Sequence, residues 1–187
     1  MDLQTAIKDA VRAAVAAGRD LSHGIAIRGR WGFICRDSNG VEKWRDTIEN
    51  IVVNAGLDYL LDAGLSGGTP ITTWYVGLVS GTPTIAAGNT MSSHAGWTEI
   101  TAYDEANRPA WTDGGVSGQA VSNTASPASF TISTDDTTIG GAFLTSSNTK
   151  GGTTGTLYAA GAFTSGNKSL DDGDTLEVTA SFTSAAA

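Results

Sequence analysis

Residues 30–48 read RWGFICRDSNGVEKWRDTI, a stretch that predicts a β-hairpin. At its centre, Asn39-Gly40 is the residue pair favoured in the tight type I′ turn between antiparallel strands. If this turn is a two-residue loop, Cys35 lies opposite Trp44, and the hairpin has an apolar face and a basic, partly exposed face. The apolar face would carry Trp31, Phe33, Cys35, Trp44 and Ile48. The basic face would carry Gly32, Ile34, Arg36, Lys43 and Arg45.

The C-terminal two thirds of the sequence consist of short strand-like runs separated by turns. The clear strand candidates alternate in polarity or are apolar on both faces, and they are residues 74–79, 130–133, 157–163 and 175–182. Weaker candidates are residues 97–102, 109–112, 118–123 and 138–145. Because residues 74–79 are apolar on both faces, we expect Trp74 to be almost completely buried. About eight short strands at this spacing predict an all-β fold, an antiparallel β-sandwich or jelly roll.

Two segments have the spacing of a helix instead. Residues 50–63 place apolar side chains on one side, with Asn50 as the expected N-cap, and predict one short helix embedded in the β fold. Residues 3–17 form a narrow apolar stripe that ends before Gly18, and the stripe consists of Leu3, Ile7, Val11 and Val15. Such a helix is marginal alone, so it either docks on its own domain or serves as an arm for a partner. We therefore expect a helical arm and linker over residues 1–29 and a sandwich domain over residues 30–187.

Charge is distributed unevenly along the 187 residues, whose net charge is −8. Residues 1–50 hold eight Lys or Arg against seven acids, whereas residues 51–187 hold three bases against twelve acids. The main body would therefore repel nucleic acid and anionic membranes, and we expect neither as a partner. Cys35 is the single cysteine, and the chain start lacks the pattern of a signal peptide, so we expect synthesis in the cytoplasm of a host cell.

Residues that could form a metal or cofactor site are few. The chain has two histidines, His23 and His94, and one cysteine, which is too few for a closed zinc site. Residues 171–174 read DDGD and offer oxygen ligands of the kind that calcium binds, but the same residues are also typical of a turn before the last strand. We expect the turn, and we expect no metal and no cofactor.

Three acidic residues, Glu99, Asp104 and Glu105, could supply the paired carboxylates of a glycoside hydrolase, with Trp97 and Trp111 nearby to stack on sugars. Their spacing specifies no particular reaction. Ser93 and His94 are adjacent, but neighbouring side chains in a strand point apart, which does not suit a nucleophile and its base. We therefore expect a protein that is not an enzyme.

The middle of the chain resembles a group of small structural proteins of tailed phages and prophages. The residues that carry the resemblance are WRDT at 44–47, NIVVNAGL at 50–57, TWYVGL at 73–78, MSSHAGWTE at 91–99, RPAW at 108–111 and KGGTTGTL at 150–157. Together they extend over roughly residues 30–183, and residues 1–29 fall outside the match. The resemblance implies a component of the virion, with head decoration as the preferred role, and it supplies no catalytic motif.

These observations predict a capsid decoration (cement) protein on the surface of the virion. Its partners would be the major capsid protein and neighbouring copies of itself, since decoration sites lie on symmetry axes and favour a homo-oligomer. The expected partner-binding residues are Leu3, Ile7, Val11 and Val15 of the arm and Arg36, Lys43 and Arg45 of the hairpin. The alternative is a tail-tip, fibre or head-fibre module that binds a host receptor or glycan. Such a module should expose aromatic side chains in one groove.

Overall fold

Antiparallel strands dominate the computed structural model, which describes residues 25–186. The strands are β1 (Ile25–Arg36), β2 (Glu42–Val52), β3 (Trp74–Ser80), β4 (Glu99–Ile100), β5 (Ala110–Trp111), β6 (Ala120–Ser122), β7 (Ala128–Thr131), β8 (Thr137–Thr145), β9 (Leu157–Ala162), β10 (Lys168–Leu170) and β11 (Thr175–Ala186). The predicted helix at residues 3–17, with Leu3, Ile7, Val11 and Val15, lies outside the described residues, as does His23. The all-β prediction is confirmed for the described part.

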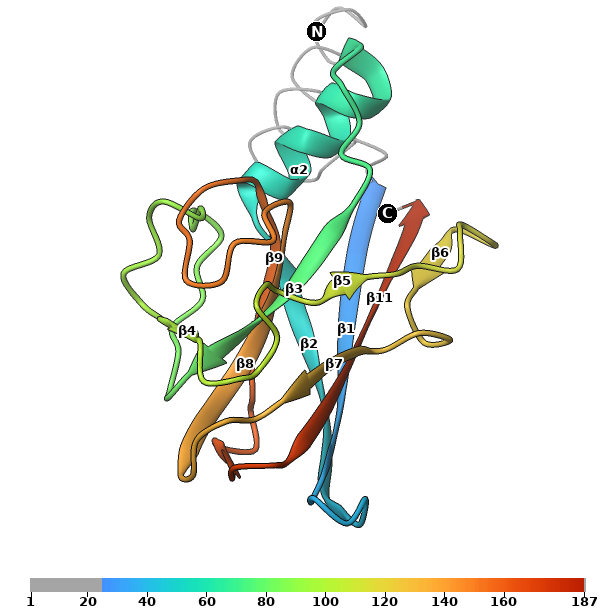
Figure 1. Ribbon diagram of the computed structural model, residues 1–187. Coiled ribbons are helices and arrows are strands. Elements are labelled where there is room, and N and C mark those ends of the chain that lie inside the picture. The colour runs from blue at the N-terminus through green and yellow to red at the C-terminus, as the bar shows by residue number, and fades with distance from the viewer. Residues whose placement is uncertain (1–24, 187) are drawn as a thin grey trace, which may run out of the picture.

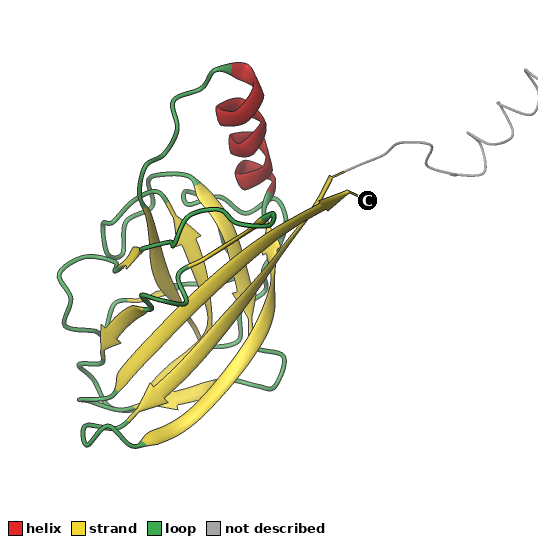
Figure 2. Cartoon of the chain, turned by 90° about the vertical axis from the view of Figure 1, so that its right-hand side faces the viewer, coloured by secondary structure: helices red, strands yellow, loops and turns green. Residues whose placement is uncertain are grey.

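The strands form one continuous sheet that curls on itself (Figure 2). Its order is β4-β3-β8-β9-β2-β1-β11-β6, with β5 beside β3, β10 beside β8 and β7 beside β11. The two edges approach each other where Tyr103, just after β4, forms an isolated bridge with Ile132, just after β7. A sandwich of two sheets or a jelly roll is not confirmed, because the hydrogen-bonded path through β2 and β9 joins all these strands into one curled sheet.

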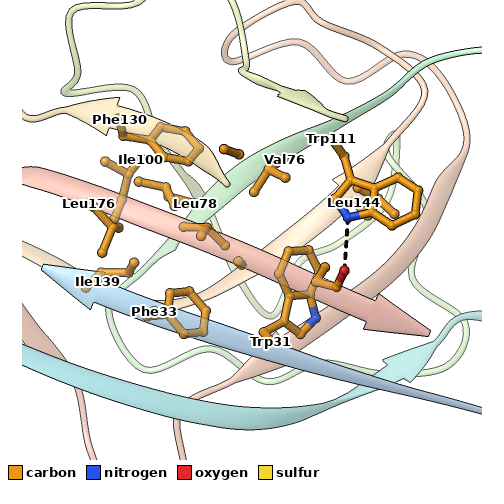
Figure 3. Close-up of a cluster of buried hydrophobic side chains, with 14 of the residues drawn as sticks. Trp31, Phe33, Val76, Leu78, Ile100, Trp111, Phe130, Ile139, Leu144 and Leu176 are labelled. Carbon is orange, nitrogen blue, oxygen red and sulfur yellow. Dashed lines mark hydrogen bonds between the residues drawn. The ribbon is translucent and has the colours of Figure 1, made fainter. Parts of the chain in front are cut away.

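The core fills the inside of the curl (Figure 3). Along β11 the alternation predicted from the sequence is observed, with Leu176, Val178, Ala180 and Phe182 buried and the residues between them more exposed. Burial of each such large apolar side chain contributes roughly 1.5–3 kcal/mol. The indole of Trp111 is also buried, and its Nε1 donates a hydrogen bond to the carbonyl oxygen of Ala180 at 3.1 Å. This bond connects β5, at one edge of the sheet, with β11 near the other.

The first hairpin has the predicted register but a different turn. Cys35 lies opposite Trp44, as expected. The two-residue loop, however, is wrong. The Asp37 amide donates to the Val41 carbonyl at 2.9 Å, and Gly40, with φ of +79°, takes the left-handed conformation within a longer loop. The Asp37 carboxylate stabilises that loop by accepting the Val41 amide at 2.9 Å.

A β-bulge compensates for the longer turn. Arg36 lies opposite Glu42 whereas Cys35 lies opposite Trp44, so Lys43 is the extra residue of β2. A bulge of this kind re-aims the side chain of the inserted residue. From Trp44 onward the residues of β2 therefore face as strict alternation predicts, whereas Lys43 and Glu42, on the turn side of Trp44, do not.

One helix, α2 (Asn54–Leu61), continues into a π-helical turn, η1 (Asp62–Ser66), and covers one end of the sheet (Figure 1). It begins four residues later than predicted, and Val53 rather than Asn50 is its N-cap. The reason is that β2 continues through Ile51 and Val52, which pair with β9. Within residues 25–186 no helix is long and apolar enough to cross a membrane.

The sheet also begins earlier than predicted. Residues 25–29, expected in the linker, form the first part of β1 and pair with β11 as far as Ala186. The start of β1 and the end of β11 therefore lie side by side, at the same end of the sheet as α2 (Figure 1, Figure 2).

Candidate functional site

The outward-facing side of β2, β1 and β11 is a candidate partner-binding surface, called here the outer face. It carries the side chains that alternate with the core residues, and these include Arg28, Arg30, Ile34, Arg36, Arg45, Thr47, Glu49, Glu177 and Thr179. A groove of about 440 Å³ crosses it at Gly32, between the cross-strand neighbours Thr47 and Thr179. The groove exists because Gly32 has no side chain, and a Cβ there would lie 2.7 Å from Thr179 Oγ1.

Arg36 and Arg45, two of the predicted partner-binding residues, lie on the outer face but have acidic partners within the chain. Arg45 Nε donates to Glu42 Oε1 at 2.6 Å, and this hydrogen bond lowers the pKa of Glu42. Arg36 Nε lies 3.9 Å from Glu177 Oε2. Both pairs are solvent-exposed, so each contributes little to folding stability and can exchange for an external carboxylate.

Arg28 and Arg30 are exposed on the same face, although they are not among the partner-binding residues predicted from the sequence. Among residues 25–186, no carboxylate lies within ion-pairing distance of either guanidinium. Arg30 Nη2 makes one weak hydrogen bond, to Thr47 Oγ1 at 3.3 Å. Strand alternation could have placed them on this face, because residues separated by an even number of positions in a strand point to the same side. Both arginines precede Arg36 by an even number of residues.

Lys43 does not share the outer face with Arg36 and Arg45, so this part of the predicted basic face is wrong. The bulge turns its side chain toward the turn before β11, where Nζ lies 2.7 Å from Asp171 Oδ2 and 2.6 Å from Asp174 Oδ2. The two carboxylates raise the pKa of Lys43, and the hydrogen bond from Lys43 lowers the pKa of Asp171. Lys43 is therefore an internal cross-link between distant segments.

Asp174 is the centre of that cross-link. Its carboxylate is buried, and its Oδ2 also accepts the Asp171 amide at 2.8 Å and the Cys35 thiol at 3.6 Å. Burial, followed by the charge of Asp174, raises the pKa of Cys35 to about 12, which keeps the thiol protonated and unreactive. Residues 171–174 form the predicted turn. Within residues 25–186, no three His, Cys, Asp or Glu side chains are arranged to hold a metal ion.

Two of the three carboxylates considered for glycoside hydrolysis, Glu99 and Glu105, make structural contacts, whereas the Asp104 side chain is exposed. Glu99 is held by Arg108 in a two-point contact, Nε to Oε1 at 2.8 Å and Nη2 to Oε2 at 2.7 Å. Glu105 accepts the backbone amide of Thr131 at 3.0 Å. Trp97 and Trp111 are both buried, so neither is an exposed stacking surface beside these carboxylates.

Arg108 connects three of the sequence motifs that carry the phage resemblance. Its side chain is fully buried and donates to Glu99, to the Ser147 carbonyl at 2.9 Å and to the Gly152 carbonyl at 2.7 Å. The segments at 91–99, 108–111 and 150–157 thus meet at one ion pair. The second histidine, His94, stacks on Trp97 with ring centroids 3.9 Å apart, in the first of these segments. These motif residues hold loops in place.

An apolar cleft of about 290 Å³ lies between α2, residues 71–74 and the β6–β11 edge. Its aromatic lining consists of Tyr59, Trp74, Trp111, Tyr158 and Phe182. The prediction that Trp74 is almost completely buried is wrong, because Trp74 begins β3 at the end of the sheet and is partly exposed. It packs on Tyr59, with ring centroids 5.1 Å apart, and on Tyr158, with ring centroids 5.3 Å apart.

Comparisons of the chain with protein-family models, with curated proteins and with solved structures found no match. The resemblance to phage structural proteins therefore stays a prediction from the sequence motifs. Two candidate surfaces for an external partner are the outer face, with its arginines, and the aromatic cleft beside α2.

Proposed function

We propose that this protein is a non-enzymatic structural component of a tailed-phage particle, a head decoration protein that binds the major capsid protein lattice through the outer face. The observation that carries the proposal is the pair Arg28 and Arg30, which are exposed on β1 next to a groove and form no ion pair among residues 25–186. Glu49 is the cross-strand neighbour of Arg30 but lies beyond ion-pairing distance. Two positive charges at this place attract an acidic protein surface.

Electrostatic contrast supports the choice of this face. Residues 51–187 hold three bases against twelve acids, so most of the remaining surface is acidic and repels acidic partners. Complementary charge accelerates encounter and fixes orientation. The outer face is also the most extensively paired part of the sheet, because β1 pairs with β11 over its whole length and with β2 over most of it. A rigid surface binds without the entropic cost of ordering a loop.

The remaining features of the proposal follow from the same role. A decoration protein on symmetry axes of the capsid contacts neighbouring copies of itself, which favours a homo-oligomer on the particle. The acidic body would face outward and keep particles dispersed. We further propose that the curled sheet is a β-sandwich or jelly roll. This is supported by the short connection between β2 and β9, where within residues 25–186 two residue pairs, Ile51–Ala160 and Val52–Ala159, join the two parts of the sheet.

The test is a sedimentation binding assay on heads assembled without this protein. Arg28→Gln with Arg30→Gln should lose at least about tenfold in affinity, as removal of two charge-assisted contacts implies. The matched control is Thr153→Glu with Thr154→Glu, which gives the same change of −2 in net charge on the exposed β8–β9 loop and should bind normally. Equal binding by both variants would refute attachment through the outer face. No binding by the unaltered protein would refute the decoration role itself.

A second candidate function is binding of a host receptor or glycan by a tail or fibre module. The aromatic cleft favours it, since Tyr59 and Trp74 are partly exposed in one concave site. Titration of purified host-surface polysaccharide should then change the tryptophan fluorescence of the protein, and Trp74→Phe should remove most of that change. An unaffected titration curve for Trp74→Phe, or no response at all, would remove this candidate.

A further inference from the structure

The outward side of α2 carries an apolar stripe that no described residue covers. The stripe consists of Leu57, Leu61 and Leu65, whose exposed fractions are 40%, 60% and 84%. Their four-residue spacing places them on one side of the helix. The opposite side packs on the sheet, where Gly56 lies so close to Tyr158 that a Cβ would be 2.3 Å from the Tyr158 carbonyl oxygen. Contiguous exposed apolar surface of this kind marks an interaction site.

Two carboxylates accompany the stripe. Asp58 and Asp62 each follow a leucine of the stripe directly in the sequence, and among the described residues neither has an ion-pair partner. At about 100° per residue, both aspartates lie along the same edge of the stripe. A binding partner should therefore present apolar side chains flanked on one edge by positive charge.

The N-terminal segment of this chain has that pattern. In a helix over residues 3–17, which the sequence predicts, Leu3, Ile7, Val11 and Val15 share one side. At about 100° per residue, Lys8 and Arg12 fall together along one edge of this stripe, while Asp9 falls on the opposite side. The segment thus matches α2 in both apolarity and charge.

The segment also enters the fold at the right place. β1 begins at Ile25, and β2 leads directly into α2; the pair Gly29 and Asn50 joins the two strands. From Gly29, β1 extends about 13 Å further to Ile25, in the direction in which β2 runs toward α2. Residues 18–24 can span up to about 24 Å. A 15-residue helix is about 22 Å long and α2 with η1 about 20 Å, so the lengths agree.

We propose that residues 3–17 bind as a helix to the Leu57–Leu61–Leu65 stripe of the same chain. The same chain is favoured over a neighbouring copy because the short connection creates an effective concentration in the millimolar range. Lys8 and Arg12 then lie against Asp58 and Asp62. This intramolecular contact does not depend on the proposed decoration role, because the outer face lies on β1, β2 and β11 and the leucine stripe lies on α2 and η1.

The experiment uses the full-length chain with two introduced cysteines, Val11→Cys and Leu61→Cys. The native Cys35 is buried and unreactive, so the introduced thiols are the ones that oxidise. A disulfide within one chain should form at the same rate between about 1 and 100 µM protein, as expected for an intramolecular reaction. The control pair, Asp9→Cys with Leu61→Cys, should cross-link at least about tenfold more slowly because position 9 lies away from the stripe. Equal rates for the two pairs, or a disulfide-linked dimer whose yield rises with concentration, would overturn the proposal.

A charge exchange provides a second measurement on the same cysteine pair. Asp58→Lys with Asp62→Lys should slow cross-linking severalfold, and adding Lys8→Glu with Arg12→Glu should restore the rate, since opposite charges then face each other again. A slow rate that the second pair of changes does not restore would contradict the contact, even in variants that fold normally.

Discussion

The Nζ atom of Lys43 lies 2.6 Å from Oδ2 of Asp174, a residue 131 positions further along the chain. The contact joins the bulge of the first hairpin to the turn that precedes β11. β1 lies between β2 and β11 in the sheet, so this ion pair connects the two outer strands of a three-strand unit at one end. The Asp174 carboxylate is buried, and Lys43 balances its charge.

We predict that Lys43→Met lowers the free energy of unfolding by about 1–3 kcal/mol, because it leaves a buried carboxylate without its ammonium partner. Asp174→Asn in the same chain should recover part of the loss, since the neutral amide needs no counter-charge. Urea unfolding followed by tryptophan fluorescence measures both. Arg45→Met, which removes an exposed cation from the same strand, is the control and should leave the midpoint unchanged.

Stability should also depend on pH through the same cluster. The hydrogen bond from Lys43 lowers the pKa of Asp171 below its ordinary value of 3.8. A carboxylate with a lowered pKa in the folded state stabilises the fold above its unfolded pKa, and this stabilisation is lost as the pH falls through the folded value. We therefore expect the urea midpoint to fall below about pH 4, and to fall less steeply in Lys43→Met. An identical pH profile for the two proteins would show that the Lys43 contact contributes nothing.

The local part of the fold was predictable from the sequence because it depends on neighbouring residues. The pairing of Cys35 with Trp44 and the alternation of Leu176 with Glu177 follow from strand periodicity, and both are observed. The orientation of Lys43 was not predictable in this way. It depends on a bulge that the Asp37 turn requires and on two carboxylates from a distant turn.

The candidate sites were harder to predict for the same reason. Trp74 is partly exposed because β3 begins at this residue. The position at which a strand begins depends on the strands that pair with it, here β5. Glu99 is unavailable for chemistry because it meets Arg108, nine residues away through an irregular loop. The position of Arg28 and Arg30 on the outer face follows once β1 is known to begin at Ile25. That start depends on the pairing of β1 with β11, a strand distant in the sequence.

Arg108 should tolerate substitution poorly. Its guanidinium, fully buried, makes a two-point contact with Glu99 and donates to two backbone carbonyls of the β8–β9 loop. Arg108→Met should lower the free energy of unfolding by about 3–5 kcal/mol, because the Glu99 charge stays buried without a partner. Arg108→Lys should rescue little, since an ammonium cannot reproduce the planar two-point contact. Thermal unfolding of the two variants decides this, and a melting temperature for Arg108→Lys close to that of the unaltered protein would contradict it.

Gly77 should accept no side chain. An added Cβ would lie 2.1 Å from Cζ of Phe143, on the neighbouring strand β8, and both residues are buried. Gly77→Ala should cost about 1–3 kcal/mol through displacement of the ring. Gly64→Ala, at a helical position where a Cβ meets nothing within 4 Å, should be neutral or stabilising. Chemical unfolding compares the two, and an equal effect of both would show that the space around Gly77 is not limiting.

Two tryptophans should differ in their contribution to stability. Trp31 is completely buried between β2 and β11, whereas Trp74 lines the cleft and is partly exposed. Trp31→Ala should cost about 3–5 kcal/mol, the usual range for truncation of a large core side chain. Trp74→Ala leaves a gap that water can enter from the cleft, so we expect roughly half that cost. The measurement is the free energy of urea unfolding, followed by far-ultraviolet circular dichroism so that loss of one indole does not remove the signal. A larger loss for Trp74→Ala than for Trp31→Ala would mean that the aromatic cluster beneath α2, and not the interior of the curled sheet, is the main source of stability.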